Sequence, residues 1–225
     1  AESAVYAASL ICAWRAAGVA WIHHWREFDR AVMRRLLAGA WPLFLADLAI
    51  VGYLKLDQLL LSHVAGPDVL GRYAAAFRMA DYAEFFALAL INSYFPRIVQ
   101  QHQEHPGGWR SEFDRFFVHM TWFSVVIAAL VTLAAPLAAS WVLGPKFGQV
   151  WPVLVVLAWA NVFVTQIAVR GKWFLLEELQ IYSLVFFAIG AGVHLVLLTG
   201  LAPRWGALGA AASFLTAQVA MAIFA

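Results

Sequence analysis

The chain contains little charge and a single cysteine. Asp, Glu, Lys and Arg make up 12% of its 225 residues, whereas hydrophobic residues make up 64%. Soluble globular domains carry roughly 25% charged residues, so this composition indicates a membrane protein. Cys12 has no second cysteine to pair with, which excludes a disulfide framework within the chain and a zinc site built on several thiolates.

Signals for catalysis, cofactors and nucleic acid are also scarce. The sequence has no Gly-rich phosphate loop and no nucleophile motif. The formal net charge of +2 is too small to favour nucleic-acid binding. His102 and His105 have a spacing that could suggest a metal, but they precede Pro106-Gly107-Gly108 and are interpreted as part of a solvated loop. We therefore expect neither an enzyme nor a cofactor or metal site.

Long apolar segments dominate what is present. A bilayer-spanning helix needs about 20 residues, and seven segments are long enough. Trp residues occur near several of their ends, where an aromatic belt lies at the membrane surface. The sequence thus predicts an all-α, polytopic membrane helical bundle. The predicted spans are residues 4–22, 41–63, 73–98, 116–142, 151–169, 180–200 and 206–225, separated by loops that include 66–68, 106–108, 144–146, 170–172 and 203–206.

Lys and Arg alternate between the two sides of this predicted topology. One set of loops holds Arg26, Arg30, Arg34, Arg35, Arg97, Arg110, Arg115, Arg170 and Lys172, and the other holds Arg72, Lys146 and Arg204. The positive-inside rule places the larger set in the cytoplasm. Residues 26–40 alternate charged and apolar residues at helical spacing, which fits either a short interfacial helix on the inner leaflet or a simple basic flank to the next span.

Six charges within two neighbouring spans point to function. A charge at the bilayer centre costs between about 3 and 17 kcal/mol, so such residues normally face a bundle interior or a wet cavity. The pattern predicts a polar path and a carrier of something hydrophilic. The first span, 41–63, holds Asp47, Lys55 and Asp57, and the second, 73–98, holds Arg78, Asp81 and Glu84.

Four of these charges are predicted to form pairs. In a tight hairpin centred near Pro67, Asp57 and Arg78 lie at similar depth, and so do Lys55 and Asp81. Pairing would relieve the desolvation of each charge. The pairs could bind substrate, or they could be static and only fix the register of the two helices.

The remaining carboxylates have no partner by this depth argument. Asp47 and Glu84 are therefore candidates for coupling to H⁺ or Na⁺, because burial favours the neutral form of a carboxyl group and brings proton uptake within reach. On the second span Glu84 flanks an arc that contains Arg78, Asp81, Phe85, Leu88 and Asn92. Arg15, in the first apolar segment, could reach the same cavity or pair with a part of the protein outside this chain.

Several short motifs, taken in order, resemble one transporter family. The chain resembles the polysaccharide flippases that translocate O-antigen and capsule units, within the superfamily that also includes multidrug and toxin extrusion carriers. The resemblance extends over residues 28–225. Its motifs are Trp41-Pro42-Leu43-Phe44, Leu56-Asp57-Gln58-Leu59-Leu60-Leu61, residues 71–78, Phe95-Pro96-Arg97, residues 143–147 and residues 202–211.

The resemblance implies a two-lobed carrier. Such flippases have two similar six-helix lobes around a central cavity and move undecaprenyl-diphosphate-linked sugar repeat units across the bacterial inner membrane by alternating access. Residues 41–225 would then be the C-terminal lobe, residues 26–40 a cytoplasmic linker helix and residues 1–25 the last helix of a missing N-terminal lobe. Because the chain begins with Ala-Glu-Ser, we interpret it as a fragment. Half a carrier encloses only half a cavity, so we expect the fragment to be inactive without that lobe.

The resemblance also suggests roles for cationic residues. Arg78 matches a motif position, and Lys55, Arg72 and Arg15 would be further cations that attract the diphosphate. His194 departs from the family pattern, which often has Asn there. An alternative within the same superfamily is a drug or toxin antiporter driven by a cation gradient, whose cavity should present carboxylates to cationic drugs.

Overall fold

The computed structural model describes the following residues: 58–104, 108–142, 144, 150–224, and the single positions 30, 33, 34, 37, 41, 44, 45 and 48. Predictions made for Arg15, Asp47, Lys55 and Asp57 lie outside this set. The chain divides into two compact units, Ala1–Trp41 and Pro42–Ala225. In the first unit the described positions from Arg30 to Trp41 are helical and exposed.

Apart from short turns, the described residues of the second unit are helical. Its elements are α3 (Pro67–Glu104), α4 (Trp109–Val142), α5 (Trp151–Leu176) and α6 (Gln180–Phe224), preceded by helical residues 58–65. The predicted all-α class is confirmed for this part of the chain. Among the described residues, three stretches are long and apolar enough to cross a membrane: Trp109–Trp141, Trp151–Leu176 and Val185–Ile223.

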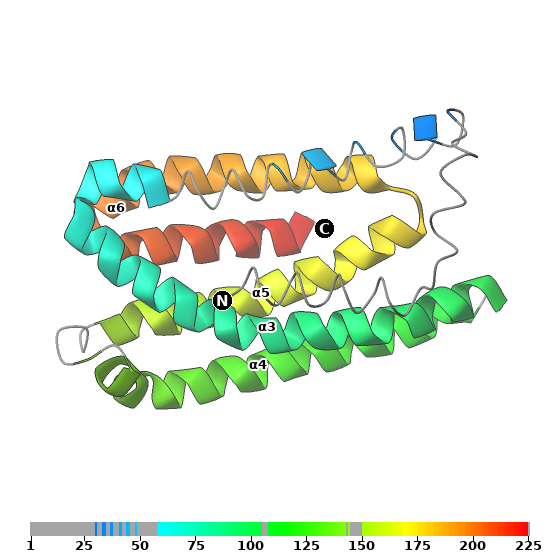
Figure 1. Cartoon of the computed structure of the whole chain (residues 1–225), viewed down its shortest axis with the longest axis horizontal. Coiled ribbons are helices and arrows are strands. Elements are labelled where there is room, and N and C mark those ends of the chain that lie inside the picture. The colour runs from blue at the N-terminus through cyan, green and yellow to red at the C-terminus, as the bar shows by residue number, and fades with distance from the viewer. Residues whose placement is uncertain are drawn as a thin grey trace, which may run out of the picture. The chain divides into compact units, whose positions relative to one another are not determined.

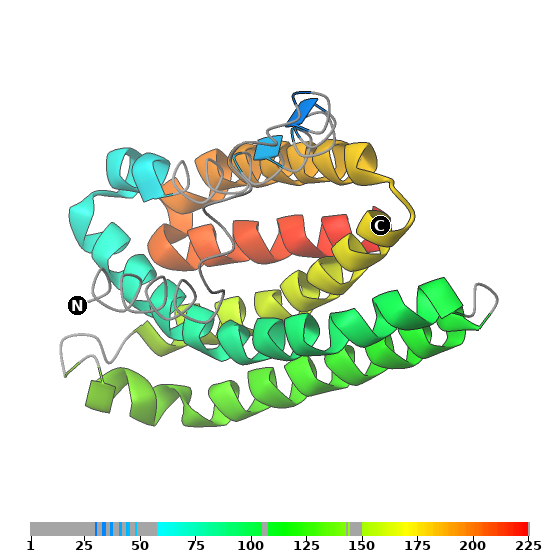
Figure 2. The ribbon, with the colours of Figure 1, turned by 45° about the vertical axis from the view of Figure 1, so that its right-hand side comes forward.

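Helix α5 occupies the centre of this unit. It contacts α3, α4 and α6, and Figures 1 and 2 both show it between the α3–α4 pair and the second half of α6. Buried residues therefore cover more than one face of α5, as expected for a strongly apolar central helix, although Trp159 remains exposed. Leu154 and Leu157 of α5 belong to a core that also includes Tyr73 of α3 and Phe214 of α6.

Helices α3 and α4 extend beyond their predicted spans. Helix α3 ends at Glu104 instead of residue 98, and α4 begins at Trp109 instead of residue 116. The last turns of α3 contact the first turns of α4. The Tyr94 hydroxyl donates to Glu112 Oε1 over 2.6 Å, and the Tyr94 ring stacks on the Phe116 ring with 4.8 Å between centroids. Arg97 Nη2 lies 3.5 Å from the same Glu112 oxygen. These contacts make helix favourable past the apolar segments.

The predicted loop at residues 170–172 is wrong. Helix α5 continues through Arg170 and Lys172 to Leu176. Helix propensity alone disfavours this, because Gly171 costs about 1 kcal/mol relative to Ala. Packing compensates: Arg170 lies over the ring of Phe117 at 5.2 Å and Lys172 over Phe95 at 5.0 Å.

Helix α6 is a hairpin of two helices. The backbone breaks at Gly206, with φ 57° and ψ −132°, a conformation that residues with a Cβ rarely adopt. Gly190 lies against Met221, the His194 ring lies 5.9 Å from Phe214, and Gly209 lies against Leu201. From one pair to the next, both residues lie closer in the sequence to Gly206. The two halves are therefore antiparallel, as Figure 1 also shows. The predicted division into two helical segments near residues 200–206 is confirmed.

Basic residues separate to the ends of the unit, as the alternating pattern predicts. Ring and ion-pair contacts bring Arg97, Arg110, Arg170 and Lys172 together where α3 and α5 end and α4 begins. Arg204 lies at the α6 turn, at the opposite end. Three exposed tryptophans share that opposite end, in keeping with an aromatic belt: Trp141, Trp151 and Trp205.

Candidate functional site

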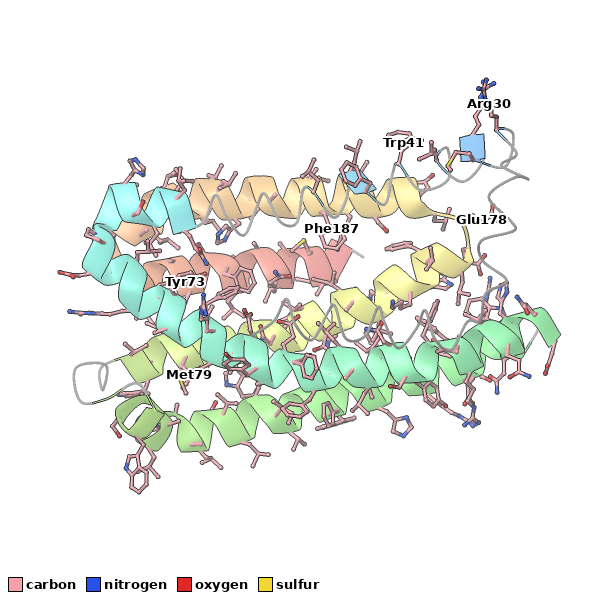
Figure 3. The ribbon with its side chains drawn as sticks, viewed as in Figure 1. Arg30, Trp41, Tyr73, Met79, Glu178 and Phe187 are labelled. Atoms are coloured by element: carbon pink, nitrogen blue, oxygen red, sulfur yellow. The ribbon has the colours of Figure 1, made fainter. Side chains whose placement is uncertain are left out.

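A cavity of about 480 Å³ lies between α3, α5 and both halves of α6. This volume is within the range of small-molecule sites. Most of its wall is apolar or aromatic. Figure 3 labels Tyr73 on α3 and Phe187 on the first half of α6, which are two of the helices that bound the cavity. It is lined by Phe77, Asp81, Glu84, Phe85, Leu88, Val164, Ile167, Ala168, Phe187, Ala191, Phe214, Gln218 and Met221.

Two carboxylates of α3 and one amide of α6 supply the polar part of this wall. Asp81 and Glu84 are one helical turn apart, and both line the cavity with Phe85 and Leu88. Of the arc predicted from helical periodicity, Asp81, Phe85 and Leu88 line the cavity, whereas Arg78 and Asn92 do not; Glu84, predicted to flank the arc, lines the cavity as well. Asp81 is exposed, whereas Glu84 is half-buried.

Of the predicted cation sites, only Arg72 and Arg78 are among the described residues, and neither is part of this wall. Arg78 precedes Asp81 by one turn, is exposed, and is absent from the cavity lining. Arg72 is exposed near the start of α3. Within the part of the chain that the structure describes, no ion pair includes Arg72, Arg78 or Asp81. The pairs with Asp57 and Lys55 stay predictions, since both partners lie outside the described residues.

Glu84 also borders a second, much smaller void. This void has a volume of about 10 Å³ and lies between α3, α4 and α5, where Ser124, Asn161 and Thr165 contribute polar groups. Such a space holds about one water molecule. Glu84 is therefore placed between the large cavity and a compact site with neutral oxygens.

The polar groups around the small void have fixed orientations. Asn161 Nδ2 donates to the carbonyl of Ala80 over 2.9 Å and ties α5 to α3. The hydroxyls of Thr165 and Ser124 donate to carbonyls of their own helices, Asn161 at 2.8 Å and Thr121 at 2.9 Å. With their hydrogens so engaged, the hydroxyl oxygens retain lone pairs that can accept a hydrogen bond or ligate a cation.

The described residues contain no group of three or more His, Cys, Asp or Glu that could hold a metal ion. His102 instead packs its ring against Trp109, with 4.9 Å between centroids. It lies in the last turn of α3 and not in a loop, so that interpretation of its surroundings is wrong.

Sequence reasoning missed Gln218 as a cavity residue. Its side chain is buried and lines the large cavity opposite α3. The only signal was an amide within an apolar span. His194, the departure from the family pattern, is fully buried against Phe214 and does not line this cavity.

Comparison with known proteins gives this arrangement a context. Residues 2–102 match the family described as "Polysaccharide biosynthesis protein". This match covers less than half of the chain and agrees with the resemblance seen in the sequence. Together with the three apolar helices, this match identifies the chain as a membrane protein.

One similar protein is the "Putative O-antigen transporter" of Shigella dysenteriae. It is 24% identical over 190 residues, which cover 84% of this chain and 47% of that protein. The chain thus spans about half the length of the curated relative it matches. No solved structure matches the chain.

Proposed function

We propose that this chain is the C-terminal lobe of a carrier that moves undecaprenyl-diphosphate-linked oligosaccharides across the bacterial inner membrane. The proposal is supported above all by the match to the polysaccharide biosynthesis family and by the transporter named among its relatives. The cavity between α3, α5 and α6, with two carboxylates on its wall, is consistent with a polar path through a carrier. Carboxylates inside an apolar bundle are costly and are kept where they serve transport. Residues 1–25 would then be the last helix of an N-terminal lobe and residues 26–40 the linker, and all seven spans would cross the membrane.

Alternating access is the mechanism that fits such a lobe. The cavity is open on one side, and a second lobe facing α3 and α6 would complete its wall. Rocking of the two lobes would expose the completed cavity first to the cytoplasm and then to the outer leaflet. The diphosphate would be attracted by Arg78, with Lys55, Arg72 and Arg15 as further cations, and the pairs Asp57–Arg78 and Lys55–Asp81 would neutralise charge between substrates.

Glu84 is our choice for ion coupling, with Asp47 as the second candidate. Within the described residues Glu84 has no ion pair, although it is half-buried. The void beside it offers three neutral oxygen groups and room for about one water or small cation. Uptake and release of H⁺ or Na⁺ there would change the charge of the cavity wall and so bias the two access states.

One observation favours a second function, a cation-coupled drug or toxin antiporter. The large cavity presents Asp81 and Glu84 and, within the described residues, no Lys or Arg. Such a wall suits a cationic substrate better than a diphosphate. The two functions therefore differ in whether Arg78 acts on the substrate.

Complementation separates them. The intact protein is expressed in a strain that lacks its own O-antigen flippase, and surface polysaccharide and drug susceptibility are both measured. For a flippase, Arg78→Ala lowers surface polysaccharide, while Arg115→Ala, an exposed arginine near the start of α4, does not. Undiminished polysaccharide with Arg78→Ala removes that residue from the mechanism, and drug resistance without polysaccharide export identifies the antiporter.

A further inference from the structure

A second cavity of about 520 Å³ lies between the start of α4 and the end of α5. It shares no lining residue with the cavity that contains Asp81 and Glu84. The turn that follows α5, marked by Glu178 in Figure 3, lies at the same end of the unit. We call this cavity the arginine groove; it is lined by Trp109, Arg110, Phe113, Asp114, Phe117, Arg170 and Trp173.

Arg170 is a half-buried cation on the α5 side of the groove. Its guanidinium lies over the ring of Phe117, and Nη1 donates to the carbonyl of Ala222 at the end of α6. No carboxylate lies within ion-pair distance of it among the residues that the structure describes. A guanidinium has five N–H donors, so most remain available. A charge removed from water in this way is stabilised by an anion with matching acceptors.

Arg110 supplies a second cation from α4. It is exposed, lies 6.0 Å over the ring of Trp109, and its Nη2 is 3.9 Å from Glu177 Oε1. An exposed pair at that distance contributes little, so Arg110 can turn towards a ligand at small cost. Asp114 is the one acidic residue of the lining, which leaves the groove with a net positive charge.

An apolar groove meets the arginine groove at Trp173, which lines both. The apolar groove has a volume of about 660 Å³. It is lined by aromatic and aliphatic residues of α5, of α6 and of the turn between them, among them Phe174, Leu179 and Phe186. A ligand that fills both must join an anionic head to an apolar tail. Free phosphate would leave the apolar groove empty.

We propose that the arginine groove binds the phosphate of a membrane phospholipid with net negative charge, with its acyl chain in the adjoining apolar groove. Arg97 and Lys172 lie at the same end of the helices and add to the positive potential there. Basic pockets between transmembrane helices on the cytoplasmic side commonly hold such headgroups. The lipid would join the ends of α4, α5 and α6 whatever substrate the protein carries.

Native mass spectrometry of the intact protein in detergent tests this site. Phosphatidylglycerol is titrated against net-neutral phosphatidylcholine, with inorganic phosphate as a soluble competitor. Loss of a charge-assisted hydrogen bond removes enough free energy to weaken binding about tenfold or more. Arg110→Gln should therefore weaken phosphatidylglycerol binding about tenfold, while Arg115→Gln, an exposed arginine outside the groove lining, should leave it unchanged.

A variant that should bind phosphatidylglycerol more tightly gives a further test. Asp114→Asn removes the repelling carboxylate from the groove, so the affinity for phosphatidylglycerol should rise, which general damage to the fold would not produce. Arg170→Lys keeps the charge but loses the planar fork and should weaken binding. If it does not fold, Arg110→Gln and Asp114→Asn still decide the matter.

Three results would overturn the proposal. They are equal binding of the two lipids, equal losses for Arg110→Gln and Arg115→Gln, and a loss of affinity with Asp114→Asn. Displacement of phosphatidylglycerol by inorganic phosphate at similar concentration would instead assign the groove to free phosphate and reject the lipid.

Discussion

The close approach of the two halves of α6 gives a prediction that can be worked out from single atoms. A Cβ added at Gly209 would overlap the backbone carbonyl of Leu201 in the facing half, well inside the 3.0 Å below which a neighbour must shift. A backbone oxygen cannot rotate away, so Gly209→Ala must separate the helices. Gly192, in the same element, has nothing within 4 Å of the position its Cβ would take.

The magnitude follows from two opposing effects. Alanine is favoured over glycine in a helix by about 1 kcal/mol, and this gain applies in both places. Overpacking costs typically about 1–3 kcal/mol, and this penalty applies only at Gly209. We therefore expect Gly192→Ala to be neutral or stabilising by up to about 1 kcal/mol, and Gly209→Ala to be the less stable of the two by about 1–3 kcal/mol.

The assay is unfolding of the intact protein in detergent, by heat and by denaturant, for the wild type and both variants. Gly190→Ala is an informative third variant, because its Cβ would meet the flexible side chain of Met221, and it should fall between the other two. The reasoning is refuted if Gly209→Ala and Gly192→Ala have the same stability, since the antiparallel contact at Leu201 would then be absent.

Further predictions concern the polar contacts of α3 and the coupling site. Asn161→Ala removes the 2.9 Å hydrogen bond to the carbonyl of Ala80 and should lower the free energy of unfolding by about 1 kcal/mol, measured by denaturant titration. Thr132→Ala is the control and should have a smaller effect, because the Thr132 hydroxyl donates to the Ala128 carbonyl within α4. Tyr94→Phe removes the 2.6 Å bond to Glu112 and should cost about 0.5–1.5 kcal/mol in the same titration; no change would mean that the α3–α4 extensions are not held there. Glu84→Gln fixes a neutral side chain, so transport in vesicles should lose its dependence on the driving ion gradient while the amount of protein in the membrane stays the same; retained dependence would transfer the coupling role to Asp47.

Helical periodicity accounts for much of the candidate site. It places Asp81, Phe85 and Leu88 on one arc of α3 with Glu84 beside that arc, and the structure finds all four on the wall of one cavity. It could not find Gln218, because a single amide in an apolar helix looks the same whether it faces a neighbouring helix or a cavity. It also could not find that Glu84 borders two spaces, since the smaller one depends on side chains of α4 and α5.

Apolar length and the distribution of Lys and Arg determined from the sequence alone that the chain is all-α, membrane-embedded and basic mainly at one end. The tertiary structure decided where α5 ends, because Arg170 and Lys172 gain their ring contacts only from α4 and α3. It also decided which charges face a cavity, since a cavity wall is assembled from helices far apart along the chain and no periodicity within one helix specifies its neighbours.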